Sequence, residues 1–210
     1  MPLLYQQNIN EHVKWALWQM DEPESFFILD GYDANHIGHA QKRKQHLAGR
    51  YVMKFLMPDL NVNDIIAPPN RKPYFSKHTG VDFSVSHSNQ MVGVLIGQQH
   101  HVGMDIEFPG QKVMMVKDKF MTEEEFMGFH GDSVSDDEKA TICWTVKESA
   151  YKLIGKMGVD FKRDLQIKEV MTTGEGWTAR LKYSGLPDDL LTANGFCIEG
   201  AHVCLMMKKN

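Results

Sequence analysis

The chain has 210 residues, of which 23 are basic and 27 acidic, and it is therefore longer than the commonest domains of about 100–150 residues. Hydrophobic residues make up 42% and charged residues 24% of the chain, a composition that excludes bulk disorder. The formal net charge of −4 argues against a general nucleic-acid binder, because such proteins are usually basic.

The cysteines and the N-terminal residues limit the classes of protein that the sequence is compatible with. Cys143, Cys197 and Cys204 show no C-x-x-C spacing, so we expect neither a disulfide framework nor a structural zinc site. The first residues lack a basic segment followed by an apolar run, and no apolar run approaches the ~20 residues of a membrane span. We therefore predict a cytoplasmic protein with no membrane partner and no nucleic-acid partner.

Charge and histidine content differ between the two parts of the chain. Residues 1–101 carry nine basic and nine acidic side chains and eight of the ten histidines, whereas residues 102–210 carry 14 basic and 18 acidic side chains. We therefore treat the two parts as separate units of organisation, the first offering cations and the second offering carboxylates.

The first strong pattern predicts a helix over residues 35–57. Apolar residues recur there at three- and four-residue steps, Asp33 or Asn35 is a candidate cap, and Pro58 marks the end. A second face of the predicted helix is basic and consists of His39, Arg43, His46, Arg50 and Lys54. This face is consistent with ordinary solvation or with an anion-binding site.

The remaining pattern mixes strands with two capped helices. Ser/Thr-x-x-Glu capping boxes at Thr122 and Ser135 predict helix starts, and the second helix should end near Lys156, with Gly155 and Gly158 as stop signals. Alternation and β-branched residues predict strands at residues 82–87, 91–96, 102–107, 164–171, 177–183 and 196–207. Strand runs that follow helices indicate the α+β class.

The sharpest candidate for chemistry is the segment Val102–Glu107. Side chains alternate faces along a strand, so Asp105 and Glu107 point the same way and lie ~7 Å apart. Two carboxylates on one face suit a hard divalent cation such as Mg²⁺. An exposed strand face without a metal is the alternative explanation of the same spacing.

A second candidate lies on the helix predicted after Ser135. Glu148 and Lys152 are four residues apart and share a helix face. They could form an ordinary surface ion pair, or Glu148 could be a metal ligand or general base while Lys152 binds phosphate.

Two further groups could bind phosphate. Ser86 and His87 stand at a predicted strand end, and Arg71 and Lys72 precede a turn into a strand. Each pair is also compatible with an ordinary structural or solvated role. The sequence contains neither a G-x-x-x-x-G-K-[S/T] loop nor a G-x-G-x-x-G turn, which excludes nucleotide binding by those two motifs.

Taken in order, these blocks resemble the Sfp-type 4′-phosphopantetheinyl transferases. The resemblance covers about residues 43–158 and weakens after residue 159. Its blocks are Leu47-Ala48-Gly49-Arg50, Arg71-Lys72-Pro73, Phe83-Ser84-Val85-Ser86-His87-Ser88, Val102-Gly103-Met104-Asp105-Ile106-Glu107 and Trp144-Thr145-Val146-Lys147-Glu148-Ser149-Ala150-Tyr151-Lys152.

The resemblance implies a fold and an activity. The fold would be a monomeric pseudo-dimer of two similar α+β subdomains, residues 1–101 and 102–210, with the active site in the cleft between them. The enzyme would transfer the 4′-phosphopantetheine arm of coenzyme A to a serine of an acyl, peptidyl or polyketide carrier protein. The other product would be adenosine 3′,5′-bisphosphate.

The resemblance also implies roles for individual residues. Asp105, Glu107 and Glu148 would hold Mg²⁺ or Mn²⁺, Glu148 would accept the serine proton, and Lys152 would contact the phosphates and assist the leaving group. The coenzyme A phosphates would be bound, besides Lys152, by residues of the first subdomain: Arg43, Arg50, Arg71, Lys72, Ser86 and His87.

The surface that receives the carrier protein is less defined by the sequence. The Met-rich segment Val113–Val116 with Phe120 and Met121 could form a groove for a carrier helix, or it could be core. Basic residues in the same segment, Lys112, Lys117 and Lys119, could dock an acidic carrier. Two other functions stay open at this point, a different Mg²⁺-dependent phosphotransferase or nucleotide hydrolase, and a non-catalytic module that binds coenzyme A or a carrier.

Overall fold

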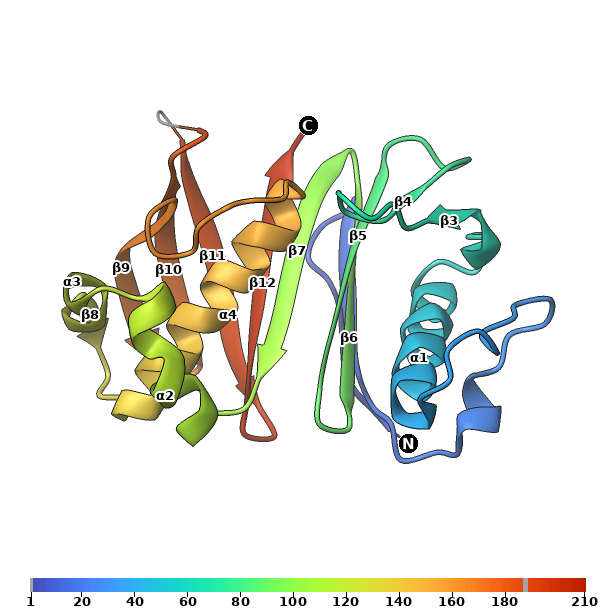
Figure 1. The fold of residues 1–210 in the computed structure, drawn as a ribbon, viewed down its shortest axis with the longest axis horizontal. Helices are drawn as coiled ribbons and strands as arrows, with labels where there is room; N and C mark the ends of the chain where they lie inside the picture. The colour runs from blue at the N-terminus through green and yellow to red at the C-terminus, as the bar shows by residue number, and fades with distance from the viewer. Residues whose placement is uncertain (1, 187–188) are drawn as a thin grey trace. The chain divides into compact units, whose positions relative to one another are not determined.

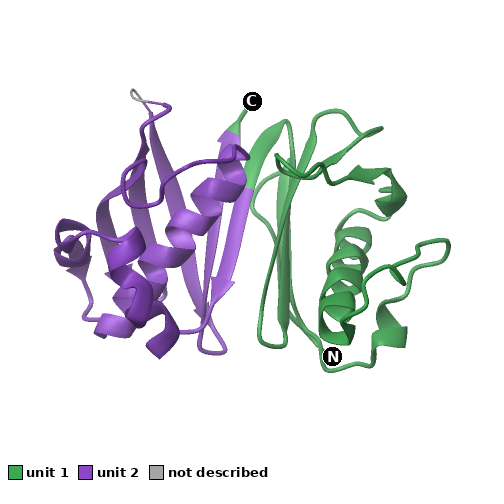
Figure 2. Cartoon of the chain, viewed as in Figure 1, with its two compact units in different colours: residues 1–102, 209–210 green, residues 103–208 purple. Residues whose placement is uncertain are grey.

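A computed structural model of the chain describes residues 2–186 and 189–210. The chain divides into two compact units, coloured separately in Figure 2. Unit 1 consists of Met1–Val102 with Lys209–Asn210, and unit 2 consists of Gly103–Lys208. Each unit contains its own main sheet and its own hydrophobic core.

Unit 1 is built on a four-stranded antiparallel sheet in the order β1-β2-β6-β5 (Figure 1). Its strands are β1 (Leu3–Asn8), β2 (Val13–Gln19), β5 (Val81–Ser88) and β6 (Met91–Gln98), and a separate small sheet pairs β3 (Ile65–Ile66) with β4 (Tyr74–Phe75). Helix α1 (Ala40–Leu56) packs against β6 and β2, while the 3-10 helices η1 (Glu24–Phe27) and η2 (Val62–Asp64) contact α1. The core of unit 1 lies between α1 and the sheet.

Gly49 allows α1 to approach this sheet closely. A Cβ atom at Gly49 would lie 3.1 Å from the Cγ1 atom of Val85 on β5, which is closer than the 3.5–4.0 Å of favourable carbon contacts. The next residue, Arg50, is therefore held beside β5.

Unit 2 is built on a six-stranded sheet in the order β7-β12-β11-β10-β9-β8. Its strands are β7 (His100–Glu107), which begins in unit 1, β8 (Phe129–Gly131), β9 (Leu165–Thr173), β10 (Gly176–Tyr183), β11 (Leu190–Ile198) and β12 (Ala201–Lys209). β8 pairs with β9 in parallel, while the pairs β9–β10, β10–β11 and β11–β12 are antiparallel. The helices are α2 (Gln111–Phe120), α3 (Glu123–Met127) and α4 (Asp136–Ile154), with α4 on the sheet and α2 on α4 (Figure 1).

Helix α4 has the ends that the sequence predicts. The Ser135–Glu138 capping box is formed at its start, and Gly155 ends it in the left-handed conformation with φ of 64°. A glycine adopts this conformation without the steric cost that a Cβ atom brings. The capping box at Thr122 is also formed, with Glu125 as its partner, and it starts α3.

Gly103 brings α4 into direct contact with β7. A Cβ atom at Gly103 would lie 2.0 Å from the Ser149 carbonyl oxygen and 2.7 Å from the Leu153 nitrogen. Both are backbone atoms of α4, so any larger residue would push the helix away from the strand. The glycine between Val102 and Met104 therefore sets the distance between the two elements that carry the candidate carboxylates.

The α+β class is confirmed, and most predicted elements are present. The predicted strands at 82–87, 91–96 and 102–107 are β5, β6 and β7, and those at 164–171 and 177–183 are β9 and β10. Strands β1 and β2 and helix α2 were not predicted. In the part of the chain that the structure describes, no helix is both long and apolar enough to span a membrane.

Two local predictions are wrong. Helix α1 begins at Ala40 instead of residue 35, and its cap is the His39 ring, because Asp33 accepts the Asn35 amide in a preceding turn. The single strand predicted at 196–207 is the end of β11 and most of β12. The turn between them places Glu199 and Gly200 at φ of 50° and 79°. Mostly apolar residues on both sides hid this turn from the pattern.

Candidate active site

Strand β7 buries a carboxylate among apolar neighbours. Met104 and Ile106 are fully buried, and the Asp105 side chain is only 5% exposed. A buried carboxylate is costly unless it is paired. Lys152 of α4 supplies the pair, because its Nζ atom lies 2.7 Å from Oδ1 of Asp105. The alternative explanation of the spacing, an exposed strand face, is therefore not what the structure shows at Asp105.

Glu148, one helical turn before Lys152, completes a set of acidic groups. Burial raises the pKa of Glu148, and the negative charges of Asp105 and Glu107 raise it further, while the ammonium group of Lys152 acts in the opposite direction. Like charges close together disfavour the ionised form. The structure thus brings Asp105, Glu107, Glu148 and Lys152 together, and we call these four residues the acidic site.

The donor chemistry of the acidic site fits a divalent metal ion. Carboxylate oxygens are the ligands that Mg²⁺ and Mn²⁺ prefer, and a cation would relieve the repulsion that Glu148 experiences. Within residues 2–186 and 189–210, however, no group of three His, Cys, Asp or Glu side chains is already arranged to hold a metal. One oxygen of Asp105 is bound by Lys152, so the ion would enter by rearranging this pair.

Unit 1 contains a basic pocket of about 580 Å³. It lies between α1, the loop before α1, and β5. Its lining residues are Ile37, Lys42, Gln45, His46, Arg50, Val85 and His87. We call this set the basic pocket. Of the phosphate-binding residues expected from the sequence, Arg50 and His87 line it. Lys42 and His46 were not among those expected, although the i, i+4, i+8 row Lys42–His46–Arg50 is visible in the sequence.

Arg50 and His46 give this pocket its electrostatic character. The Nε atom of Arg50 is buried and has no hydrogen-bond partner among the described residues. Burial lowers the pKa of Arg50, and a hydrogen bond with Tyr32 opposes that shift. The Tyr32 hydroxyl also lies 2.6 Å from Nε2 of His46. Burial, Arg50 and His36 lower the pKa of His46 to about 4. Burial is thus the main cause of both shifts, and the charge of Arg50 adds to the shift of His46.

The other expected phosphate ligands have different surroundings. Nε of Arg43 lies 2.9 Å from Oε1 of Glu24, and the Arg43 guanidinium also donates to the Ile37 carbonyl oxygen at 3.0 Å. Arg71 lies over the Tyr74 ring at 5.2 Å. Lys72 Nζ lies 2.7 Å from Oδ2 of Asp82.

Ser86 and His87 project to opposite sides of their strand. Adjacent residues in a β-strand alternate faces, and His87 lines the basic pocket together with Val85. Ser86 is buried on the other face of β5. The two residues, which the sequence pairs, therefore do not reach one small ligand group from the same face.

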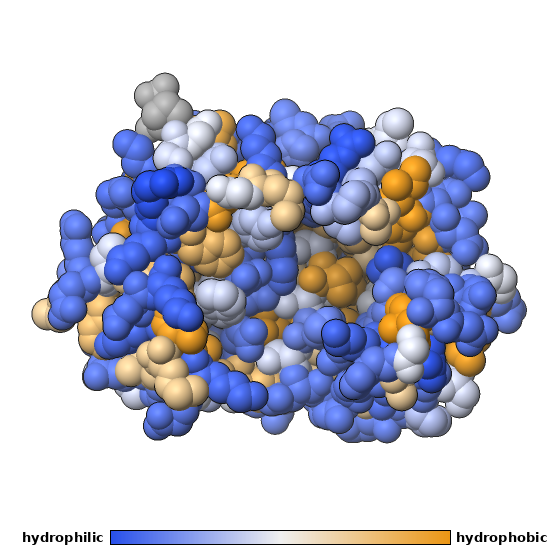
Figure 3. Space-filling view, in the orientation of Figure 1, coloured by the Kyte–Doolittle hydropathy of each residue, from blue (hydrophilic) through white to orange (hydrophobic). Residues whose placement is uncertain are grey.

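Helix α2 divides the Met-rich segment between core and surface. Val113 and Met114 pack against the core, and Phe120 and Met121 are buried in it. Met115 is 75% exposed, and Val116 is also exposed. On the face shown in Figure 3, apolar side chains form separate patches in a mainly hydrophilic surface. A pocket of about 390 Å³ lies beside the end of α2. It is lined by Val116, Lys119, Phe120, Trp144 and Phe161, and we call it the aromatic pocket.

Comparison with known proteins finds a match over the segment that contains the acidic site. The sequence profile of the 4′-phosphopantetheinyl transferase superfamily matches residues 101–186. This segment contains β7 and α4 and with them the whole acidic site. Over this segment the chain is similar to the 4′-phosphopantetheinyl transferase superfamily.

A curated relative points to the same superfamily. The chain is 28% identical over 114 residues to a protein of Aneurinibacillus migulanus named 4′-phosphopantetheinyl transferase gsp. The alignment covers 50% of this chain and 45% of the relative, so the matched part is about half of each. The resemblance expected from the sequence motifs is confirmed at the level of the superfamily.

Proposed function

We propose that this protein transfers the 4′-phosphopantetheine arm of coenzyme A to a serine of an apo carrier protein, releasing adenosine 3′,5′-bisphosphate in a Mg²⁺-dependent reaction. The observation that carries the proposal is the acidic site, in which Lys152 and the carboxylates of Asp105, Glu107 and Glu148 converge within the matched segment. Phosphoryl-type transfer depends mainly on positioning and on neutralising charge.

In this proposal Asp105, Glu107 and Glu148 hold the metal ion, which when bound neutralises charge on the pyrophosphate oxygens. Glu148, directly or through a water that it orients, accepts the proton of the incoming serine. The serine oxygen forms a bond to the phosphorus next to the pantetheine. The bond from that phosphorus to the bridging oxygen breaks, and its electron pair leaves with the adenosine bisphosphate. Lys152 exchanges Asp105 for a phosphate oxygen and stabilises this leaving group.

The basic pocket would hold the phosphates at the nucleotide end of coenzyme A. Arg50 and His87 are assigned this contact, and Lys42 and His46 join them because they line the same pocket. The buried Nε of Arg50 is a donor that a phosphate oxygen can satisfy. Arg43 is left out of this assignment, since Glu24 and the Ile37 carbonyl already bind it.

The remaining roles implied by the resemblance stay within the proposal. Lys72, Ser86 and Arg71 are assigned contacts with the pyrophosphate or ribose.

The carrier protein would dock at α2. Met115 and Val116 offer an exposed apolar surface, and Lys112, Lys117 and Lys119 make α2 basic, with Asp118 as its single acidic residue. An acidic carrier helix would complement this charge. Reversing the charge with Lys117→Glu and Lys119→Glu should raise the KM for the carrier about tenfold while leaving the affinity for coenzyme A unchanged. An equal loss of both would contradict a docking role.

The proposed reaction is tested by mass spectrometry of apo carrier proteins incubated with the protein, coenzyme A and Mg²⁺. A panel of fatty-acid, polyketide, peptide and lysine-pathway carriers should include one that gains a phosphopantetheine adduct on its serine. Cleavage of coenzyme A without an adduct would favour a nucleotide hydrolase. Binding of coenzyme A with neither cleavage nor an adduct would favour a non-catalytic module.

A further inference from the structure

Arg50 carries the clearest sign of a ligand in the basic pocket. Its Nε atom is buried and has no hydrogen-bond partner among residues 2–186 and 189–210. A buried donor without an acceptor costs free energy, and the pocket beside it, of about 580 Å³, has room for a phosphate group. Because the guanidinium group is positively charged and Lys42 lines the same pocket, the acceptor that suits this donor is an anion.

Tyr32 joins Arg50 to His46, which lies one helical turn earlier on α1. A hydrogen bond links the Tyr32 side chain to Arg50, and the Tyr32 hydroxyl oxygen lies 2.6 Å from Nε2 of His46. A guanidinium group only donates, so the hydroxyl oxygen accepts from Arg50. The hydroxyl hydrogen then donates to Nε2 of His46, the one acceptor that the described part of the chain offers it.

These partners determine which ring nitrogen of His46 carries a proton. Burial, together with the charges of Arg50 and His36, lowers the pKa of His46 to about 4, so near pH 7 the ring is neutral and has one N–H group. Since Nε2 accepts from Tyr32, that N–H group is at Nδ1. His46 lines the basic pocket, and Nδ1 is therefore the nitrogen that remains to donate to an anion there.

The sequence places Tyr32 through a turn in the loop before α1. The Tyr32 amide donates to the Leu29 carbonyl oxygen at 3.0 Å, and Gly31, at the third position of this turn, has φ of 74°. A positive φ at that position favours glycine. The Arg43 guanidinium holds the end of the same loop through the Ile37 carbonyl oxygen at 3.0 Å. Arg43 thus fixes the loop that carries Tyr32.

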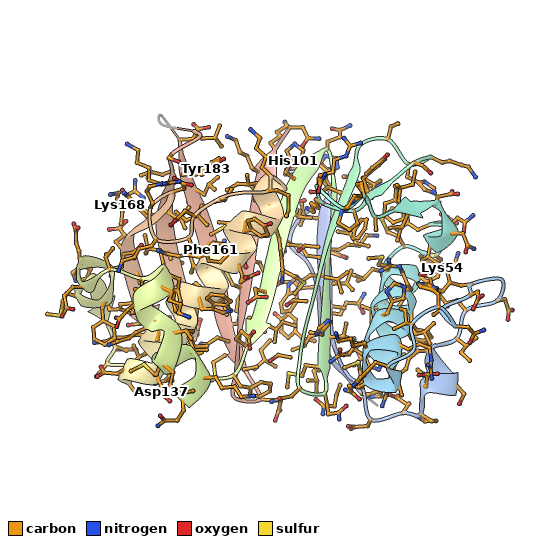
Figure 4. The ribbon with its side chains drawn as sticks, in the orientation of Figure 1. Lys54, His101, Asp137, Phe161, Lys168 and Tyr183 are labelled. Atoms are coloured by element: carbon orange, nitrogen blue, oxygen red, sulfur yellow. The ribbon has the colours of Figure 1, made fainter. Side chains whose placement is uncertain are left out.

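The basic row of α1 ends outside the pocket. Lys54, labelled in Figure 4, lies one turn beyond Arg50. Its ammonium group donates to the Pro58 carbonyl oxygen after the helix, and it is not part of the pocket lining. The pocket therefore uses the earlier part of the row, within residues 42–50, and the last two members of that part contact Tyr32.

We propose that Tyr32 is a positioning residue of the basic pocket: its hydroxyl group holds Arg50 and fixes the His46 proton on Nδ1, so that both side chains donate to one phosphate group. This inference rests on the proposed function, in which the basic pocket holds a phosphate of coenzyme A. Tyr32 is not part of the pocket lining, so it acts through its two neighbours.

The first test is calorimetric titration of the full chain with adenosine 3′,5′-bisphosphate at about pH 7.5, with a chelator that removes metal ions. Tyr32→Phe removes one oxygen atom and should weaken binding about tenfold. In a His46→Phe background the same change should weaken binding less than about threefold, because one of its two contacts is already absent. Tyr5→Phe, on a ring that stacks on Trp15 in the same unit, is the control and should bind as the wild type does.

A second pair of variants moves Tyr32 without changing its side chain. Gly31→Ala and Gly80→Ala each place a Cβ atom on a residue with positive φ, 74° and 83°, and neither Cβ would have an atom within 4 Å. Both should lower Tm by similar amounts through backbone strain. Only Gly31→Ala should also weaken nucleotide binding, by about threefold. Equal affinities of the two variants would contradict a role for the position of Tyr32.

Nitrogen NMR of the histidine rings measures the tautomer itself. In the wild type at about pH 7.5, His46 should carry its proton on Nδ1, and in Tyr32→Phe part of this proton should move to Nε2. A merely structural tyrosine would leave the tautomer unchanged. A wild-type His46 with its proton on Nε2 would overturn the assignment.

The titrations can overturn the inference in three further ways. An unchanged nucleotide affinity in a folded Tyr32→Phe variant would make the hydroxyl group irrelevant to binding. A full tenfold loss in the His46→Phe background would show that Tyr32 does not act through His46. A wild type that binds no nucleotide would overturn the proposed use of the basic pocket and the role of Tyr32 with it, and the wild-type titration alone distinguishes this result from the other two.

Discussion

The acidic site of unit 2 and the basic pocket of unit 1 compensate their charges differently. In the acidic site, the carboxylate of Asp105 is already neutralised by Lys152 at 2.7 Å. In the basic pocket, the buried Nε of Arg50 has no hydrogen-bond partner among the described residues, and the neighbouring His46 is held neutral near pH 7. In the acidic site the buried carboxylate of Asp105 has an internal counter-ion, whereas in the basic pocket a buried donor of Arg50 is left over.

This difference predicts how each region responds to a ligand. An anion in the basic pocket adds hydrogen bonds to Arg50 without breaking any that Nε makes now. A metal ion at Asp105 must first displace the ammonium group of Lys152, and a phosphate oxygen is the partner that can draw this group away. The proposed metal affinity of the acidic site should therefore depend on a bound phosphate, whereas anion binding in unit 1 should not depend on a metal.

The largest expected effect is on the acidic site itself. Glu148→Gln removes the proposed base and a proposed metal ligand, so carrier modification in excess Mg²⁺ should fall by about 10²–10⁴-fold. The fold should stay intact, because burial and the charge of Asp105 raise the pKa of Glu148 and make its ionised form unfavourable in the native state. The matched control, Glu169→Gln on β9, where the side chain is 39% exposed, should keep full activity. Near-normal turnover by the Glu148 variant would remove that residue from the mechanism.

The next effect tests the contact that assembles this site. In Gly103→Ala the new Cβ atom would meet the Ser149 carbonyl oxygen at 2.0 Å, so α4 must shift away from β7. We expect a loss of stability of about 3 kcal/mol, the upper part of the usual range for overpacking. Displacement of Glu148 and Lys152 from Asp105 should reduce transfer about 100-fold. Gly110→Ala is the control, since nothing lies within 4 Å of its Cβ position. Equal Tm values for the two alanine variants would contradict the role of Gly103.

A smaller and more specific effect is expected for Lys152→Ala. Without the ammonium group, kcat should fall about tenfold while the KM for coenzyme A changes less, since the leaving group loses its stabilisation. In the absence of coenzyme A, the same variant should bind Mn²⁺ about tenfold more tightly than the wild type, because Asp105 no longer has a competing cation. Direct titration of Mn²⁺, followed by its electron paramagnetic resonance signal, measures this. Weaker Mn²⁺ binding by the variant would show that Lys152 does not compete for Asp105.

The two regions also differ in how far the sequence predicts them. Asp105 and Glu107 lie on a short strand with strict alternation, and Glu148 and Lys152 lie four apart on a helix with a clear capping box. Local periodicity therefore predicts which of these side chains share a face. It does not predict that β7 and α4 touch, because this depends on the absence of a side chain at Gly103.

The basic pocket was harder to predict because it depends on how α1 is rotated against β5. The periodicity of the sequence predicts a basic face on α1. It does not predict which of the adjacent rows of residues on that face points toward β5. The structure turns Lys42 and His46 toward the pocket and leaves Arg43 with Glu24. The partner of Arg43 lies 19 residues away in the chain, in a 3-10 helix with no strong sequence signal, so the sequence could not show that this arginine was already engaged.

The smallest expected effect is a change in proton binding at His46 when a nucleotide binds. Its folded pKa of about 4 lies below the ordinary histidine value of 6.5, so between these values the unfolded chain binds more protons and stability falls as the pH drops. A bound phosphate next to His46, as in adenosine 3′,5′-bisphosphate, should favour the protonated ring and offset the charges of Arg50 and His36. Binding of this nucleotide at about pH 5.5 should then take up a fraction of a proton.

Calorimetry of nucleotide binding in two buffers with different ionisation enthalpies measures this uptake, and His46→Gln should abolish it. The mutated position is in contact with Tyr32, so Tyr32→Phe serves as the comparison that keeps the imidazole while removing its hydroxyl partner. Proton uptake that is the same in wild type and in the His46 variant would assign the proton to another group.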